Sequence, residues 1–185
     1  MKLLFFVISY CVNFLKSIIM FMASRKGLYV EKTFTILLYQ LLELRIFIEE
    51  FYENFSLSDT AKNNYALNNT SRILAAEEKK HINFYRQWVK EAEPEKDYII
   101  ENGVFSQFEF QLINLKQSLS SYGIYTAGQL IAKAIDIQNN LIFLITNIRD
   151  TLKTDRNFPM NHVLDAILKE EQKFLASLLP FRRLS

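Results

Sequence analysis

A carboxylate and an imidazole, Glu78 and His81, stand three residues apart in a stretch of helical pattern. On a helix this spacing places both side chains on the same face. Glu171 lies among apolar positions of a later helical pattern, where a carboxylate needs a partner because an unpaired ion in an apolar interior is very costly. Carboxylates and imidazoles gathered inside a protein either bind a metal such as iron or manganese or pair with buried cations. Glu78, His81 and Glu171 are therefore the candidate metal ligands.

Two further polar residues, Gln138 and Arg45, interrupt apolar helix faces. The seam around Gln138, traced at roughly 100° per residue, is otherwise apolar: Ala127, Ile131, Ala134, Leu141, Ile145 and Ile148. Arg45 lies on the flank of the face that holds Leu41 and Ile48. The carboxylates on the same helix point away from that face and are predicted to be solvated: Glu43, Glu50 and Glu53. We expect Arg45 and Gln138 to share one buried polar layer with the candidate ligands.

Simpler interpretations stand beside this one. His81 could be a core histidine, and Glu171 could form only a local pair with a neighbouring lysine. The large aromatic residues are interpreted as core filling: Tyr52, Tyr65, Tyr85 and Trp88. His162 lies more than two turns before Glu171 on the same predicted helix, so it is assigned no role.

Four long helical patterns must position the layer. The first covers residues 30–55, and the second follows the turn and N-cap residues at 56–59 and runs to about Lys90. The third starts at Thr126, where Gln129 gives the spacing of a capping box, and runs to about Leu152. The fourth opens at Pro159, which suits a first helical turn, and ends near Leu178.

The segment from residue 92 to residue 125 behaves differently. It contains a short amphipathic stretch from Phe105 to Leu119, which is broken at 120–123. Two helical hairpins joined by one long crossover are the connectivity of ferritin-like bundles. The sequence thus predicts an all-α fold: an antiparallel four-helix bundle over residues 25–185, with one long crossover carrying a short extra helix, and an apolar N-terminal helix before it.

Composition supports this class. The 185 residues include only 4 Gly and 3 Pro, too few for the turns of a many-stranded sandwich or barrel. The net charge is +2 and the basic residues form no stripe, so nucleic acid is not expected as a partner. A single cysteine, Cys11, cannot form an internal disulfide, which favours a reducing cytoplasm.

Residues 1–24 form a mostly apolar segment with Lys2, Asn13 and Lys16 within it. A central lysine costs a membrane span roughly 2.5 to 3.5 kcal/mol, and the small-residue pattern of a signal cleavage site is poor. The segment is interpreted either as a membrane anchor or as a mis-assigned start upstream of the bundle. The expected location is the cytoplasm, with membrane contact through residues 1–24 as the alternative.

The stretch from Leu74 to Tyr85, with Glu77-Glu78-Lys79-Lys80-His81 at its centre, resembles the second helix of the rubrerythrin and ferritin-like family. The resemblance implies a carboxylate-bridged di-iron site in which Glu78 and His81 are ligands. The stretch from Val163 to Leu175 resembles the fourth helix and its second Glu-x-x-His motif, with Phe174 at the histidine position. The resemblance covers about residues 30–178.

This chain departs from the family pattern at three ligand positions. The third-helix glutamate position holds Gln138, the first-helix position holds Arg45, and Phe174 replaces a histidine. Glu43 could be the first-helix ligand only if the loop between the first two helices were two residues longer than is usual in the family. Its helical phase places it on the side opposite the core, which argues against that role. A di-iron site uses four carboxylates and two imidazoles, whereas this chain offers two carboxylates and one imidazole.

These departures support two hypotheses. In the first, an ion-pair network replaces the di-iron centre: Glu78 and Glu171 are balanced by Arg45 and a protonated His81, no metal is bound, and the protein has a structural or interaction role. In the second, Glu78, His81 and Glu171 hold a single iron or manganese ion for redox chemistry. The chain has no cysteines for a rubredoxin-type iron site. The family resemblance also implies self-association as a homodimer.

Overall fold

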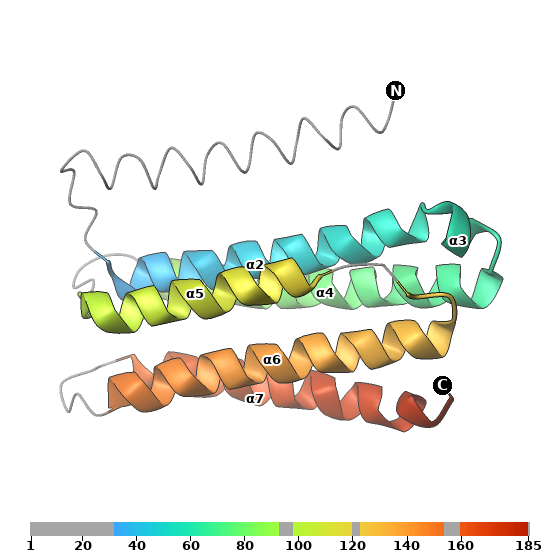
Figure 1. Ribbon diagram of the computed structural model, residues 1–185. Coiled ribbons are helices and arrows are strands. Elements are labelled where there is room, and N and C mark those ends of the chain that lie inside the picture. Colours follow the sequence, from blue (N-terminus) through green and yellow to red (C-terminus); the bar gives the residue numbers. More distant parts are fainter. Residues whose placement is uncertain (1–31, 93–97, 120–122, 154–159, 185) are drawn as a thin grey trace, which may run out of the picture. The chain divides into compact units, whose positions relative to one another are not determined.

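The computed structural model of the chain describes residues 32–92, 98–119, 123–153 and 160–184, and these are almost entirely helical (Figure 1). The elements are α2 (Phe34–Ser56), α3 (Asp59–Lys62), α4 (Tyr65–Ala92), α5 (Asn102–Ser118), α6 (Ala127–Lys153), α7 (Asn161–Leu178) and the 3-10 helix η1 (Leu179–Leu184). Within these ranges extended pairing is limited to one isolated bridge between Thr33 and Ile99. The prediction of an all-α fold is confirmed.

The long helices pack in pairs. α2 lies along α4, α6 lies along α7, and α4 contacts α6. The two helices of each pair run in opposite directions (Figure 1). α5 starts near the end of α4 and runs back along α2, so that α6 begins at the end of the array where α4 also begins (Figure 1). The connection between α4 and α6 therefore spans the length of the helices, and α5 packs on α6 and on α2.

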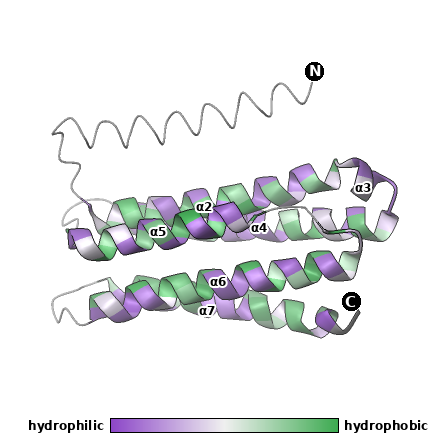
Figure 2. Cartoon of the chain, in the orientation of Figure 1, coloured by the Kyte–Doolittle hydropathy of each residue, from purple (hydrophilic) through white to green (hydrophobic). Residues whose placement is uncertain are grey.

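One continuous core of buried apolar side chains joins the helices. Each long helix carries both apolar and polar residues along its length, as Figure 2 shows, and the apolar ones recur at the helical spacing that brings them to one side. Burying one Leu or Ile contributes about 2 kcal/mol. Central members of this core are Leu41, Leu44 and Ile48 of α2, Leu141 and Ile145 of α6, and Leu164 and Ile167 of α7.

Side-chain caps define the ends of the first helices. Thr33 accepts a hydrogen bond from the backbone N–H of Ile36 at the start of α2. Ser58 accepts from Ala61 N (3.2 Å) and caps α3, whereas Asn64 Oδ1 accepts from Leu67 N (3.1 Å) and starts α4. The sequence predicted one helix after the turn and N-cap residues at 56–59, running to about Lys90, whereas the structure has two helices in this stretch. Two N-caps in succession divide that stretch into two helices.

The start of α6 follows the predicted capping box. Thr126 Oγ1 accepts from Gln129 N (3.2 Å), and Gln129 Oε1 accepts from Thr126 N (3.0 Å). Gly123, just before this helix, has a positive φ of 79°, a conformation that glycine adopts without steric cost. The crossover helix α5 is longer than predicted at its start, since it begins at Asn102 rather than Phe105. α7 begins at Asn161, and Pro159 lies outside the described residues.

No helix within the ranges given above is both long and apolar enough to cross a membrane. The predicted apolar helix and anchor at residues 1–24 lies outside those ranges.

Candidate functional site

Four polar side chains, one from each of the paired long helices, lie inside the apolar core. They are almost fully buried: Arg45 of α2 (0% exposed), Glu78 of α4 (1%), Gln138 of α6 (1%) and Glu171 of α7 (0%). Helical phase had placed each of them on or beside an apolar face, and the structure brings them into one network. We call these four residues the polar layer.

The guanidinium of Arg45 forms the centre of the polar layer. Its Nη1 donates to both carboxylate oxygens of Glu78, over 3.1 Å to Oε1 and 2.8 Å to Oε2. Burial acts to lower the pKa of Arg45, but Glu78 and Tyr85 together outweigh it, and the pKa is raised. Burial raises the pKa of Glu78, while Arg45 opposes that shift. Arg45 therefore remains a cation inside the core.

The second amino group of Arg45 connects α2 to α6 and α7. Arg45 Nη2 forms an ion pair with Glu171 Oε2 and donates to Gln138 Oε1 over 3.3 Å. The amide nitrogen of Gln138 donates to the Glu171 carboxylate and also to the Glu171 backbone carbonyl, the latter over 3.0 Å. Gln138 thus fills both hydrogen-bonding roles of its amide and bridges the arginine and the carboxylate.

Tyr85 of α4 is a further member of this site. Its hydroxyl donates to Glu171 Oε1 over 2.7 Å, and the Arg45 guanidinium carbon lies 5.7 Å from its ring centroid. Burial raises the pKa of Tyr85 to about 12. The phenol therefore stays protonated and serves as a donor. Sequence reasoning treated Tyr85 as core filling, although its spacing of seven residues from Glu78 already placed both on one helix face.

His81 lies beside the polar layer but is neutral. Its ring packs on Phe174, with ring centroids 4.7 Å apart. Burial, followed by the nearby charges of Arg45 and Lys80, lowers the pKa of His81 to about 3. The expectation that a protonated His81 would balance a carboxylate was wrong, because the core and the arginine disfavour a second positive charge.

The candidate metal ligands do not form a metal-binding group in the described residues. Among residues 32–92, 98–119, 123–153 and 160–184, no set of three or more His, Cys, Asp or Glu side chains is arranged to hold an ion. Glu78 and Glu171 both direct carboxylate oxygens to Arg45. Phe174, which the family resemblance placed at a histidine position, packs on His81.

Glu171 does not pair locally with a lysine. The neighbouring Lys173 pairs with Glu170 over 2.9 Å on the surface. The carboxylates predicted to be solvated on the first helix are all exposed, which confirms that part of the analysis: Glu43, Glu50 and Glu53.

Glu49 was not identified from the sequence, although it lies one helical turn after Arg45 and so shares its side of α2. It is 7% exposed, and its Oε1 lies 3.2 Å from Lys79 Nζ.

Tyr52 and Tyr65 were both predicted to fill the core, and the prediction holds for one of them. Tyr52 is buried, whereas Tyr65 is 86% exposed, because it opens α4 at the end of the array. His162, to which no role was assigned, is exposed near Trp88.

Comparisons with known proteins found no matching family model, no matching curated protein and no matching solved structure.

Proposed function

We propose that this chain is a ferritin-like antiparallel four-helix bundle in which the polar layer occupies the place of a di-iron centre, and that it has a structural or interaction role without catalysis. The observation that carries this proposal is the position of the Arg45 guanidinium, which is fully buried and pairs with both Glu78 and Glu171. An arginine is never deprotonated in a protein, so it holds the two carboxylates permanently.

The connectivity supports the ferritin-like part of the proposal. Two antiparallel pairs, α2 with α4 and α6 with α7, are joined by a crossover as long as the helices themselves (Figure 1). In ferritin-like di-iron proteins, two helices each supply one Glu and the other two each supply a Glu-x-x-His motif. The corresponding positions here are Arg45, Gln138, the pair Glu78 and His81, and the pair Glu171 and Phe174.

Charge supports the metal-free part. A divalent metal is stabilised by carboxylates and repelled by a cation. Here Glu78 already accepts hydrogen bonds from Arg45, and Glu171 forms an ion pair with it. Glu171 accepts further bonds from Tyr85 and Gln138. A metal would have to displace an arginine whose side chain is fully buried.

One observation favours the alternative, a mononuclear iron or manganese oxidoreductase using Glu78, His81 and Glu171. In the described part of the chain, His81 Nδ1 is buried without a hydrogen-bond partner. A buried nitrogen of this kind is either left unsatisfied at a cost or bound to something else, such as water or a metal.

Metal analysis of the purified full-length chain tests the proposal. We expect iron, manganese and zinc to be well below one ion per chain. Stoichiometric iron or manganese that is lost on Glu78→Ala would establish the mononuclear alternative.

A gain of metal binding tests the ferritin-like register. The triple substitution Arg45→Glu, Gln138→Glu and Phe174→His restores the four carboxylates and two imidazoles of a di-iron site, so we expect it to bind about two iron ions per chain. The matched control adds Glu78→Gln and should lose most of that iron. A triple variant that is helical by circular dichroism and binds no iron would refute the proposed correspondence of positions.

A further inference from the structure

The four long helices form two antiparallel pairs. We call α2 with α4 the first hairpin and α6 with α7 the second hairpin (Figure 1). In each hairpin the two helices contact each other more extensively than either contacts the other hairpin. The alignment of one hairpin along the other is therefore held by fewer contacts than the alignment within a hairpin.

The polar layer lies where the two hairpins meet. Each of its four residues stands near the middle of its helix. Arg45 of the first hairpin forms an ion pair with Glu171 of the second and donates to Gln138 Oε1 over 3.3 Å. Tyr85 of the first hairpin donates to Glu171 Oε1 over 2.7 Å. Directional contacts thus connect the two hairpins at one level along the helices.

The apolar contacts between the hairpins do not define one alignment. One helical turn before each member of the polar layer, on the same side of its helix, stands a buried apolar residue: Leu41, Leu74, Ala134 and Ile167. If the second hairpin slid by one turn, about 5.4 Å, aliphatic side chains would still meet aliphatic side chains. Apolar burial is non-directional, and exchanges among apolar side chains of similar volume are well tolerated.

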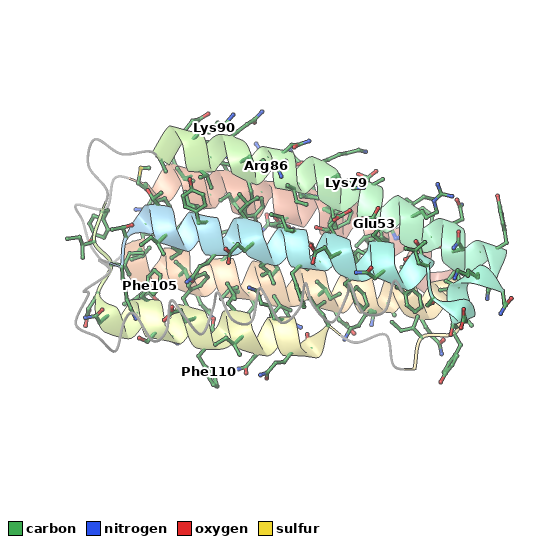
Figure 3. All side chains as sticks on the ribbon, turned by 90° about the horizontal axis from the view of Figure 1, so that it is seen from above. Glu53, Lys79, Arg86, Lys90, Phe105 and Phe110 are labelled. Carbon is green, nitrogen blue, oxygen red and sulfur yellow. The ribbon has the colours of Figure 1, made fainter. Side chains whose placement is uncertain are left out.

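The surface charges of α4 act elsewhere. Lys79 lies 3.2 Å from Glu49 Oε1 and 3.6 Å from Glu53 Oε1, both on α2 of the same hairpin. In Figure 3 Arg86 and Lys90 project outward from α4. These charges hold the first hairpin together or face solvent, and they do not align it with the second.

We propose that the polar layer is a register lock: it selects one alignment of the two hairpins, and it makes the fold less stable than an apolar core would. A slide of one turn would leave Arg45 paired with Glu78 but would bury Glu171 without its cation. An unpaired buried charge of this kind disfavours the shifted alignment by more than about a hundredfold. A single buried polar residue fixes register in the same way in coiled coils.

This inference deepens the structural role proposed above and rests on it, because a metal at this level would take the carboxylates away from Arg45. The two proposals fail separately. Stoichiometric iron or manganese would refute the metal-free role, whereas the register lock is judged by the distance between the hairpins.

An apolar replacement of the site is the first test. The substitutions approximately keep side-chain volume and remove the polar groups: Arg45→Met, Glu78→Leu, Tyr85→Phe, Gln138→Leu and Glu171→Leu. Nitroxide labels on Ile73→Cys of α4 and Phe143→Cys of α6, both at exposed positions, are placed in a Cys11→Ser background. Pulsed electron paramagnetic resonance of the full-length chain then gives the distribution of distances between the hairpins.

With the polar layer intact we expect one narrow distance distribution. The apolar variant should show at least one further population, because alignments that differ by about 5.4 Å become accessible. Its urea midpoint should be no lower than that of the wild-type chain. A matched control keeps the polar layer, repacks apolar residues one turn away and should keep the single distance: Leu41→Met, Leu74→Met and Ile167→Leu. A single unchanged distance, a lower urea midpoint or loss of the helical circular dichroism signal in the apolar variant would each overturn the inference.

Moving the lock by one turn is the second test. The substitutions shift the carboxylate of α7 and the amide of α6 in the same direction: Ile167→Glu, Glu171→Ile, Leu141→Gln and Gln138→Leu. Because Arg45 stays in place, the second hairpin must slide by one turn to restore its pairs. We therefore expect the main distance between the labels to differ from the wild-type value. A variant that keeps the wild-type distance would show that packing sets the register, and the inference would fail.

Discussion

Replacing His81 with phenylalanine should change the pH dependence of stability more than it changes stability at neutral pH. The pKa of His81 in the folded chain is lowered to about 3, first by burial and then by Arg45 and Lys80. In the unfolded chain the imidazole has its ordinary pKa of about 6.5. Between these two values the unfolded state binds a proton that the folded state does not, so His81 destabilises the folded state as pH falls.

The magnitude follows from the two pKa values. Each pH unit below the unfolded pKa costs roughly 1.4 kcal/mol until the folded pKa is reached. From pH 7.5 to pH 4.5 the wild-type chain should therefore lose about 3 kcal/mol that a variant without the imidazole does not lose. Phenylalanine keeps a ring against Phe174, and any change in packing adds an offset that is independent of pH.

Urea unfolding of wild type and His81→Phe at several pH values between 4.5 and 7.5 measures this difference. The carboxylates titrate in both proteins, so subtracting one curve from the other isolates His81. We expect the free energy of unfolding of the variant, relative to that of wild type, to rise steadily as the pH falls below about 6.5. A difference that stays constant across this range would show that the folded chain accepts a proton on His81, and the account of a neutral buried imidazole beside Arg45 would be refuted.

The remaining predictions concern the polar layer itself and use the same unfolding assay at neutral pH. Arg45→Met should destabilise the fold by about 3 to 5 kcal/mol, because it leaves two carboxylates buried without a cation. Adding Glu78→Gln and Glu171→Gln should recover most of that loss. If it does not, packing rather than charge sets the cost. Glu171→Gln should cost more than Glu78→Gln, since Glu171 pairs with Arg45 and accepts from Gln138 and Tyr85, whereas among the described residues Glu78 accepts from Arg45 alone. Equal losses would contradict this ranking.

Much of the fold follows from local patterns in the chain. Apolar spacing along a helix depends only on neighbouring residues, so the faces that bury Gln138 and Glu171 could be traced without coordinates. The capping box of Thr126 and Gln129 is equally local, and it starts α6 as expected. The division of the second helical pattern was missed because Asn64, which caps α4, is a residue that also occurs within helices.

The partners inside the core depended on packing between distant segments. Arg45 and Gln138 are 93 residues apart, and Tyr85 and Glu171 are 86 apart, so no spacing rule could assign one hydrogen bond over another. The protonation state of His81 also required the folded arrangement, since it depends on burial and on the distance to Arg45. Helical periodicity shows which side of a helix faces inward, whereas charge state and pairing are set by whatever the other helices bring to that side.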